Sequence, residues 1–263
     1  MTFTLITLFF ILGLLVGSFL NVVIYRHNTK KSLGGRSHCM VCQNQLTWYE
    51  LIPLFSFLGL MGRCKNCKTK ISIQYPLVEL ISGLIFVGLF YKFSYLFYLD
   101  TFSFFITFIF YALVFSLLLV ISVYDLKHKI IPDKLVGILA ILSFVGLFLF
   151  SSIGLSPHIP SVWDFLSGII IALPFALIWL ISRGKWMGLG DAKLLVGLGW
   201  LVGMERIITG VVISFWLGAI IGVLLILLSR KYSIKSEIPF APFLVLGTIL
   251  TFLFEIRFFQ LWF

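Results

Sequence analysis

The chain has 263 residues, of which 60% are hydrophobic and only 11% are charged, and its mean hydropathy is +1.11. A soluble domain carries about 25% charged residues, so this composition excludes a single water-soluble core. Apolar runs of about 20 residues instead predict helices that cross a bilayer. The chain is therefore expected to be an all-α polytopic membrane protein. Its net charge of +10 is what basic loops between spans produce, and it predicts no nucleic-acid partner.

The apolar runs predict about eight transmembrane helices. They cover residues 3–25, 76–92, 101–123, 134–151, 164–182, 192–204, 207–228 and 240–258. The sixth run is short for a complete crossing, which takes about 20 residues. The first is not expected to be a cleaved signal peptide, because its basic residues follow the apolar run rather than precede it.

The basic residues predict how the chain is oriented in the membrane. Most of the 20 lysines and arginines fall in four segments that lie on one side of the predicted membrane, residues 26–75, 127–134, 183–193 and 230–235. Loops rich in lysine and arginine stay in the cytosol. We therefore expect a multi-pass membrane protein, surrounded by lipid, with these segments in the cytosol and both termini outside.

One water-facing insertion, residues 26–75, contains all four cysteines. Cys39 and Cys42 form one C-x2-C pair, and Cys64 and Cys67 form a second. Disulfides are disfavoured in the cytosol, whereas two such pairs are typical of a tetrahedral four-cysteine zinc site. Four thiolates leave no open position for water, so the Zn2+ would be structural. Four free thiols or a redox pair are the alternatives.

Two further features of this region carry predictions. The stretch LIPLFSFLGL, residues 51–60, is too short to cross a bilayer and is expected to lie against the membrane surface. Asn21 is a polar residue near the end of the first predicted span. We expect it to form a hydrogen bond to a neighbouring helix.

Two aspartates stand out because charges beside membrane spans are costly. Asp125 ends the third span, and Asp191 opens the sixth. If these two helices pack together, the carboxyl groups meet at one depth near the cytosolic boundary and tend to share a proton. Such a pair supplies one acid and one base for the hydrolysis of a peptide bond. Helix ends favour Asp191 as the ionised base and Asp125 as its protonated partner.

Two glycines precede the second aspartate. Gly188 and Gly190 lack a Cβ, so another backbone can approach them closely. They are candidates for positioning an extended substrate segment beside the aspartates. A flexible turn with Asp191 as a helix cap is an equally simple interpretation. A phosphate-binding loop is not indicated, because no Gly-Lys-Ser/Thr sequence follows.

Six motifs in this order resemble the type IV prepilin peptidases, which are bifunctional leader peptidases and N-methyltransferases. Besides the paired C-x2-C module, they are GSFLNVVIYR (17–26), YPLVELISG (75–83), YDLKHKIIPD (124–133), GLGDAKLL (188–195) and PFAPFL (239–244). The Gly-x-Gly-Asp element is also shared with presenilin-like intramembrane proteases. The resemblance covers nearly the whole chain.

The resemblance implies a domain organisation and an activity. It implies a first transmembrane helix (1–25), a methyltransferase-associated zinc module (26–75) and a transmembrane aspartic peptidase core (76–263). Asp125 and Asp191 would be the catalytic aspartates that cut a basic leader from prepilin or pseudopilin substrates on the cytosolic side. The new amino terminus would then be methylated with S-adenosylmethionine as the co-substrate.

Glu79 has two interpretations. It lies near the start of the second span, where a glutamate complements the helix dipole. A carboxylate could also bind the positively charged sulfonium of S-adenosylmethionine, so Glu79 is a candidate cofactor-binding residue.

A proton-coupled transporter with an aspartate relay is the main alternative function. Transport sites usually lie near the membrane midplane between repeats. The sequence shows no convincing inverted repeat, and both aspartates are predicted near the membrane boundary. We therefore favour the peptidase.

Overall fold

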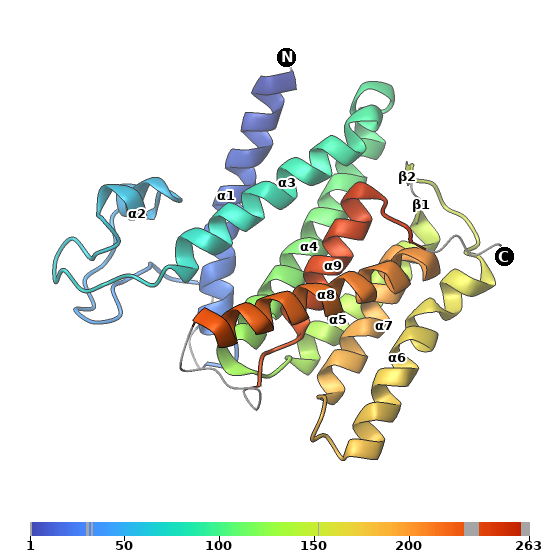
Figure 1. The fold of residues 1–263 in the computed structure, drawn as a ribbon. Coiled ribbons are helices and arrows are strands. Elements are labelled where there is room, and N and C mark those ends of the chain that lie inside the picture. The colour runs from blue at the N-terminus through green and yellow to red at the C-terminus, as the bar shows by residue number, and fades with distance from the viewer. Residues whose placement is uncertain (1, 30–31, 33, 152, 229–236, 259–263) are drawn as a thin grey trace. The chain divides into compact units, whose positions relative to one another are not determined.

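The computed structural model describes residues 2–29, 32, 34–151, 153–228 and 237–258 (Figure 1). Five basic residues that contributed to the predicted orientation lie outside this set: Lys30, Lys31, Arg230, Lys231 and Lys235. The described chain is mostly helical. It forms two compact units, Met1–Ser94 and Tyr95–Phe263. The boundary between them falls inside a helix rather than in a loop.

The first unit contains two long helices and the insertion that joins them. Its elements are α1 (Thr2–Arg26), a 3-10 turn η1 (Trp48–Leu51), α2 (Phe55–Gly59) and most of α3 (Gln74–Leu99). In Figure 1 the insertion leaves the lower end of α1 and returns to the start of α3. Both long helices are apolar enough to span a membrane.

Small residues let α1 and α3 pack closely. A Cβ at Gly13 would lie 2.8 Å from the Cα of Gly83, and a Cβ at Gly17 would lie 2.7 Å from the Cα of Glu79. One turn further along α1, the predicted interhelical hydrogen bond of Asn21 is confirmed, because its Nδ2 donates to the carbonyl oxygen of Tyr75 at 3.1 Å. Close packing of small residues, reinforced by a polar contact, is a common way for membrane helices to associate.

We expect Gly17→Ala to destabilise this pair of helices. The new methyl group meets backbone, which cannot rotate away, so unfolding should become easier by about 1–3 kcal/mol. Thermal unfolding of the full chain in detergent measures the effect. Gly137→Ala is the matched control, because a Cβ there meets nothing within 4 Å; an equal loss in both variants would contradict the close-packing interpretation.

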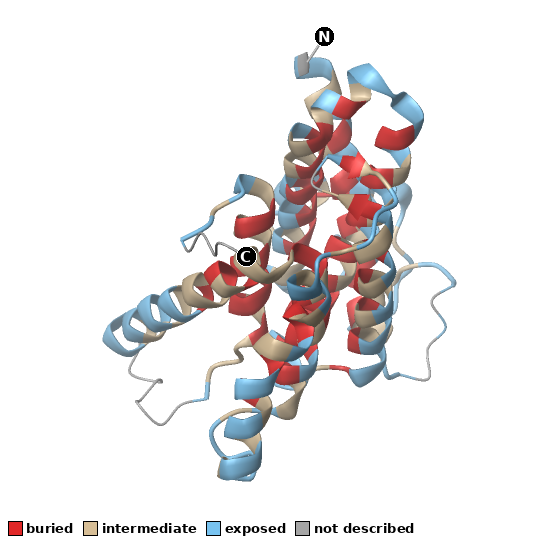
Figure 2. Cartoon of the chain, turned by 90° about the vertical axis from the view of Figure 1, so that its right-hand side faces the viewer, coloured by how far each residue is buried: buried red, intermediate tan, exposed pale blue. Residues whose placement is uncertain are grey.

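The second unit is built around α4. Its elements are α4 (Thr101–His128), α5 (Asp133–Leu149), β1 (Phe150–Ser151), β2 (Gly154–Leu155), α6 (Val162–Ser182), α7 (Leu189–Val202), α8 (Met204–Leu228) and α9 (Ala241–Phe254). Helix α4 is largely buried along its length. Figure 2 shows the buried residues of the chain in red. The two short strands pair antiparallel, with Phe150 opposite Leu155. Helix α8, by contrast, is exposed over most of its surface.

The predicted spans correspond to eight helices with shifted boundaries. Among the described residues, five helices are long and apolar enough to cross a membrane: α1, α3, α4, α6 and α8. Helix α5 has 17 residues, and α7 and α9 have 14 each. At 1.5 Å per residue, 14 residues cover about 21 Å, which is less than the ~30 Å hydrocarbon core. The count of eight complete crossings is therefore not established by the structure.

Candidate functional site

Asp125 lies in the last turn of α4, as expected for a residue that ends the third predicted span. The helix continues to His128 because Lys129 adopts a left-handed conformation, and its N–H closes the turn on the carbonyl oxygen of Asp125 at 2.7 Å. Only 5% of the Asp125 surface is exposed. A carboxyl group that has left water so completely needs a nearby partner or a chemical role.

Asp191 lies in the first turn of α7, where it is 8% exposed. Gly188 occupies the capping position of this helix, so Asp191 is not the cap. Its Oδ1 is buried and has no hydrogen-bond partner in the described structure. The positive end of the α7 dipole favours a carboxylate at this position, and the unpartnered oxygen is free to bind a reacting group.

Two other helices, α5 and α9, connect the helices that carry the two aspartates. Within the described chain, α4 and α7 share little direct packing, whereas α5 and α9 each pack against both. The carboxyl groups are close enough to interact electrostatically. The expectation that α4 and α7 themselves pack together is therefore corrected: α5 and α9 hold them.

The first turn of α9 is a partner of Asp125 that sequence analysis did not identify. The backbone N–H of Ala241 interacts with the Asp125 carboxyl group. Ala241 stands between the two prolines of PFAPFL, whose ordinary role is to open a helix. The carboxyl group of Asp125 thus contacts the N-terminus of α9, and Asp191 lies in the first turn of α7, so the helix-end argument no longer distinguishes which one is ionised.

The two glycines before Asp191 differ in their surroundings. A Cβ at Gly190 would lie 2.9 Å from the Cβ of Ile131, in the segment between α4 and α5. A Cβ at Gly188 would meet nothing closer than Asp191 Oδ2, at 3.8 Å. Gly190 is therefore required by the packing of this chain, and Gly188 is the one with open space beside it.

We expect Gly190→Ala to lower peptide-cleaving activity by displacing Asp191. A shift of about 1 Å at a reacting group can cost on the order of 10²-fold in rate. Adding Ile131→Gly should restore activity, because it removes the Cβ, Cγ1 and Cδ1 atoms that the new methyl group meets. Gly188→Ala is the comparison; with thermal stability unchanged, a fall in its kcat/KM would indicate that substrate lies against Gly188. Failure of the double variant to recover would count against the Ile131 contact.

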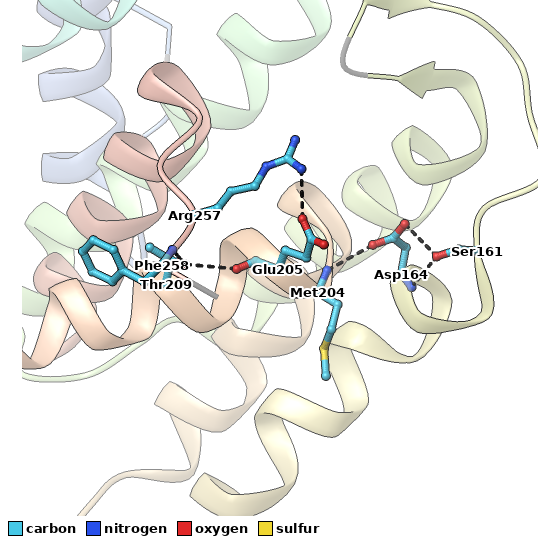
Figure 3. Close-up of polar contacts among 7 residues, drawn as sticks. All are labelled: Ser161, Asp164, Met204, Glu205, Thr209, Arg257 and Phe258. Atoms are coloured by element: carbon cyan, nitrogen blue, oxygen red, sulfur yellow. Dashed lines mark hydrogen bonds and ion pairs between the residues drawn. The ribbon is translucent and has the colours of Figure 1, made fainter. Parts of the chain in front are cut away.

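Helix lengths show that Asp191 is set back from the end of the bundle. Asp164, in the first turn of α6, accepts a hydrogen bond from the backbone N–H of Met204, just after α7, at 3.1 Å (Figure 3). Gly168 of α6 and Gly199 of α7 also meet backbone to backbone. From Gly168, α6 continues for 14 residues to Ser182, whereas α7 extends only 10 residues from Gly199 back to Leu189. At 1.5 Å per residue, α7 therefore begins about 6 Å short of the far end of α6.

Two acidic residues at the end of the helices opposite the aspartates form hydrogen bonds and an ion pair with other parts of the chain. Besides Met204, Asp164 binds the hydroxyl group of Ser161 at 2.8 Å. Glu205 forms an ion pair with Arg257 at 2.9 Å (Figure 3). Each of these two carboxylates therefore ties two chain segments together. Near the aspartates, the exposed Asp133 pairs with Lys193 at 2.8 Å, and Pro132 occupies the capping position of α5.

The two cysteine pairs fold as two copies of one turn. Each first cysteine accepts a hydrogen bond from the residue after the second cysteine: Gln43 N–H to Cys39 O, and Lys68 N–H to Cys64 O, both at 3.0 Å. Gln43 and Lys68 are both left-handed, with φ of 57° and 58°. Antiparallel bridges close the turns, His38 with Gln45 and Arg63 with Lys70.

The four sulfur atoms converge on one point. All four Sγ atoms lie within 4.8 Å of one another, and those of Cys39 and Cys67 are 3.8 Å apart. Zinc–sulfur bonds of about 2.3 Å in a tetrahedron separate the sulfur atoms by about 3.8 Å. The donor set and its spacing therefore fit a Zn2+ ion.

Side chains around the cysteines stabilise the insertion. Glu50 accepts hydrogen bonds from the hydroxyl and backbone N–H of Thr47, at 2.6 and 2.8 Å. These bonds, chiefly that of the hydroxyl, lower the pKa of Glu50. Lys65 donates to the hydroxyl group of Tyr49 at 2.8 Å, and this bond raises the pKa of Lys65.

Glu79 is held by the insertion rather than open to solvent. It is buried in the second turn of α3, and its Oε2 accepts a hydrogen bond from the backbone N–H of Leu54 at 2.9 Å. Its Cα lies against Gly17 of α1. A sulfonium group would have to share this carboxylate with Leu54, so a cofactor-binding role for Glu79 gains no support from its contacts.

Comparisons with known proteins agree with the geometry. Residues 11–93 match the Bacterial Peptidase A24 N-terminal domain, and residues 112–223 match the Type IV leader peptidase family. These matches follow the two compact units closely. No solved structure matches the chain.

Curated relatives share the sequence over most of its length. The chain is 32% identical to a prepilin leader peptidase/N-methyltransferase of Bacillus subtilis, covering 95% of this chain and 94% of the relative. For proteins of the same name, the identity is 30% in Vibrio cholerae, over 98% and 99% of the two chains, and 34% in Myxococcus xanthus, over 87% and 65%. The chain belongs to the type IV leader peptidase family and is a membrane peptidase of that family.

Proposed function

We propose that the chain removes the basic leader from prepilin or pseudopilin substrates, using Asp125 and Asp191 as one catalytic unit. The observation that carries this proposal is the burial of both carboxyl groups within electrostatic reach of each other. Two like charges in so little water favour a state in which the pair holds one proton. Family membership supports the reaction, because relatives bear the name prepilin leader peptidase.

Each group would have its own task in this reaction. The ionised member of the pair takes a proton from water, and the protonated member donates a hydrogen bond to the carbonyl oxygen of the scissile peptide. The Ala241 N–H lies against Asp125 and stabilises a negative charge there during the exchange. The unpartnered Oδ1 of Asp191 is placed to bind the attacking water.

The site is proposed to lie just below the cytosolic surface of the inner membrane. All eight apolar helices would contribute to the membrane domain, including α5, α7 and α9, which are short. Because α7 begins about 6 Å short of the end of α6, the aspartates would be set back from the surface. An extended leader–helix junction of the substrate could reach them past Gly188. The membrane lipid is then the expected surrounding, and no nucleic acid is involved.

A second activity is proposed for the first unit. Relatives are named N-methyltransferases as well as peptidases, so the new amino terminus would receive a methyl group from S-adenosylmethionine. Cys39, Cys42, Cys64 and Cys67 would hold a Zn2+ ion, whose role is to fix the fold of the insertion. The methyl-donor site is not assigned to particular residues.

Co-expression with a prepilin-like substrate tests the proposal. Cleavage appears as a gel shift, and mass spectrometry of the mature amino terminus detects an added methyl group. We expect both modifications. A proton-coupled transporter would leave the substrate uncut, so an intact leader in the presence of folded protein would refute the peptidase function.

A further inference from the structure

The insertion carries an apolar loop, residues 51–60, that is unusual for a water-facing segment. It contains no charged residue. Phe55 and Leu58 lie three residues apart on α2, so they share a face, and each is 71% exposed. Large exposed apolar groups in one patch mark a surface that contacts a partner or a membrane.

The packing of α1 against α3 shows how far along these two helices the loop lies. Gly13 lies against Gly83, Gly17 against Glu79, and Asn21 against Tyr75. The two helices therefore run antiparallel in a fixed register. Gly17 precedes Arg26, the last residue of α1, by nine residues, which is about 13 Å along the helix.

Glu79 fixes the position of the apolar loop along the α1–α3 pair. Its carboxylate accepts the N–H of Leu54, the residue before α2, at 2.9 Å. A helical side chain tilts toward the helix N-terminus, so Leu54 lies somewhat nearer the start of α3 than the Glu79 backbone does. Even so, it stays on the membrane side of Arg26. In Figure 1, α2 is drawn level with the middle of α1 rather than beyond its lower end.

The backbone of the loop is suited to an environment without water. Leu54 has φ 59° and ψ −50°, and Phe55 N–H closes a tight turn on Pro53 O at 2.6 Å. Segments in hydrocarbon must satisfy their polar backbone groups internally. N–H groups throughout the loop and just after it donate within the chain: those of Leu54, Phe55, Ser56, Leu58, Leu60, Met61, Gly62 and Arg63.

The residues that border the loop suit the headgroup region. Trp48 is exposed beside Tyr49, and these two residue types are enriched at membrane interfaces. The Tyr49 hydroxyl accepts a hydrogen bond from Lys65, so its polar end points toward a cation. Basic residues of the insertion, among them Lys65 and Arg63, can pair with anionic headgroups.

We propose that the apolar loop inserts into the acyl-chain region of an anionic bilayer beside α1 and α3, with Glu79 as its anchor. The partner of the Phe55–Leu58 face is lipid. The insertion is then a domain with one edge in the membrane, and its cysteine turns remain in water. This inference depends on α1 and α3 being membrane helices and is independent of the peptidase reaction.

Photolabelling of the wild-type full chain tests the proposal. The protein is reconstituted in phosphatidylethanolamine–phosphatidylglycerol vesicles that contain a phospholipid with a diazirine on its acyl chain, and adducts are mapped by mass spectrometry. Phe55 and Leu58 should be labelled as strongly as Leu84, an exposed residue of α3. Val41, which is 66% exposed in the first cysteine turn, should remain unlabelled. Labelling of Phe55 and Leu58 no higher than that of Val41 would overturn the proposal.

Two variants test the anchor. Glu79→Gln retains an oxygen that can accept the Leu54 N–H, whereas Glu79→Ala removes it. Labelling of Phe55 and Leu58 should persist in the first variant and be lost in the second, with Leu84 labelled in both. Full labelling in Glu79→Ala would show that Glu79 does not set the depth of the loop.

Discussion

Asp125→Asn and Asp191→Asn should each abolish leader cleavage, with a fall in rate of about 10³-fold, within the range that general acid–base groups contribute. An amide can neither take a proton from water nor hold the proton that the pair shares. Because the two groups act as one unit, the double variant should be no slower than either single variant. Single-turnover cleavage of a prepilin-like substrate in membranes measures all three rates.

The control for this prediction is Asp100→Asn, at the opposite end of α4. Asp100 caps that helix by accepting the N–H of Phe102 at 3.1 Å, and asparagine caps a helix equally well. Its cleavage rate should match that of the unaltered chain. A neutral amide is less costly to bury than a carboxylate, so the variants at Asp125 and Asp191 should keep their thermal stability. Inactivity that comes with unfolding would point to a structural role instead.

Loss of one cysteine should unfold the insertion. Cys64→Ser removes a ligand from a buried position, and structural zinc sites contribute about 10–16 kcal/mol in small domains. We expect the variant to lose its zinc and to become sensitive to protease between α1 and α3. Elemental analysis of the purified chain gives the zinc content, and limited proteolysis locates the cuts.

Val41→Ser is the matched control for the zinc site. Val41 lies in the same turn as Cys39 and Cys42 but offers no ligand atom. This variant should keep one zinc ion per chain and its resistance to protease. A zinc content of zero in the unaltered chain, or a folded Cys64→Ser insertion without zinc, would exclude a structural metal here. Leader cleavage and methylation, measured on the same samples, show whether either activity depends on the insertion.

Local patterns in the sequence were enough to predict several features. The spacing of the cysteines predicted that four thiols converge, and the structure brings all four sulfur atoms within 4.8 Å. This succeeds because each C-x2-C turn forms from adjacent residues and needs few distant contacts. The eight apolar runs likewise located α1 and α3 to α9, of which five are long enough to cross a membrane, because a segment in hydrocarbon must satisfy its own backbone. Helix ends were less certain: α4 continues through Asp125 because of the left-handed Lys129.

Contacts between distant segments were decided only by tertiary structure. The sequence singled out Asp125 and Asp191, but it did not show that α5 and α9 hold their helices or that Ala241 faces Asp125. It suggested a cofactor role for Glu79, whereas in the folded chain that carboxylate accepts a hydrogen bond from the backbone N–H of Leu54. These pairings join residues far apart in the chain, and the register of one helix against another depends on which small residues let backbones meet. Hydropathy reports how deeply a segment prefers to be buried, but it carries no information about which neighbour buries it.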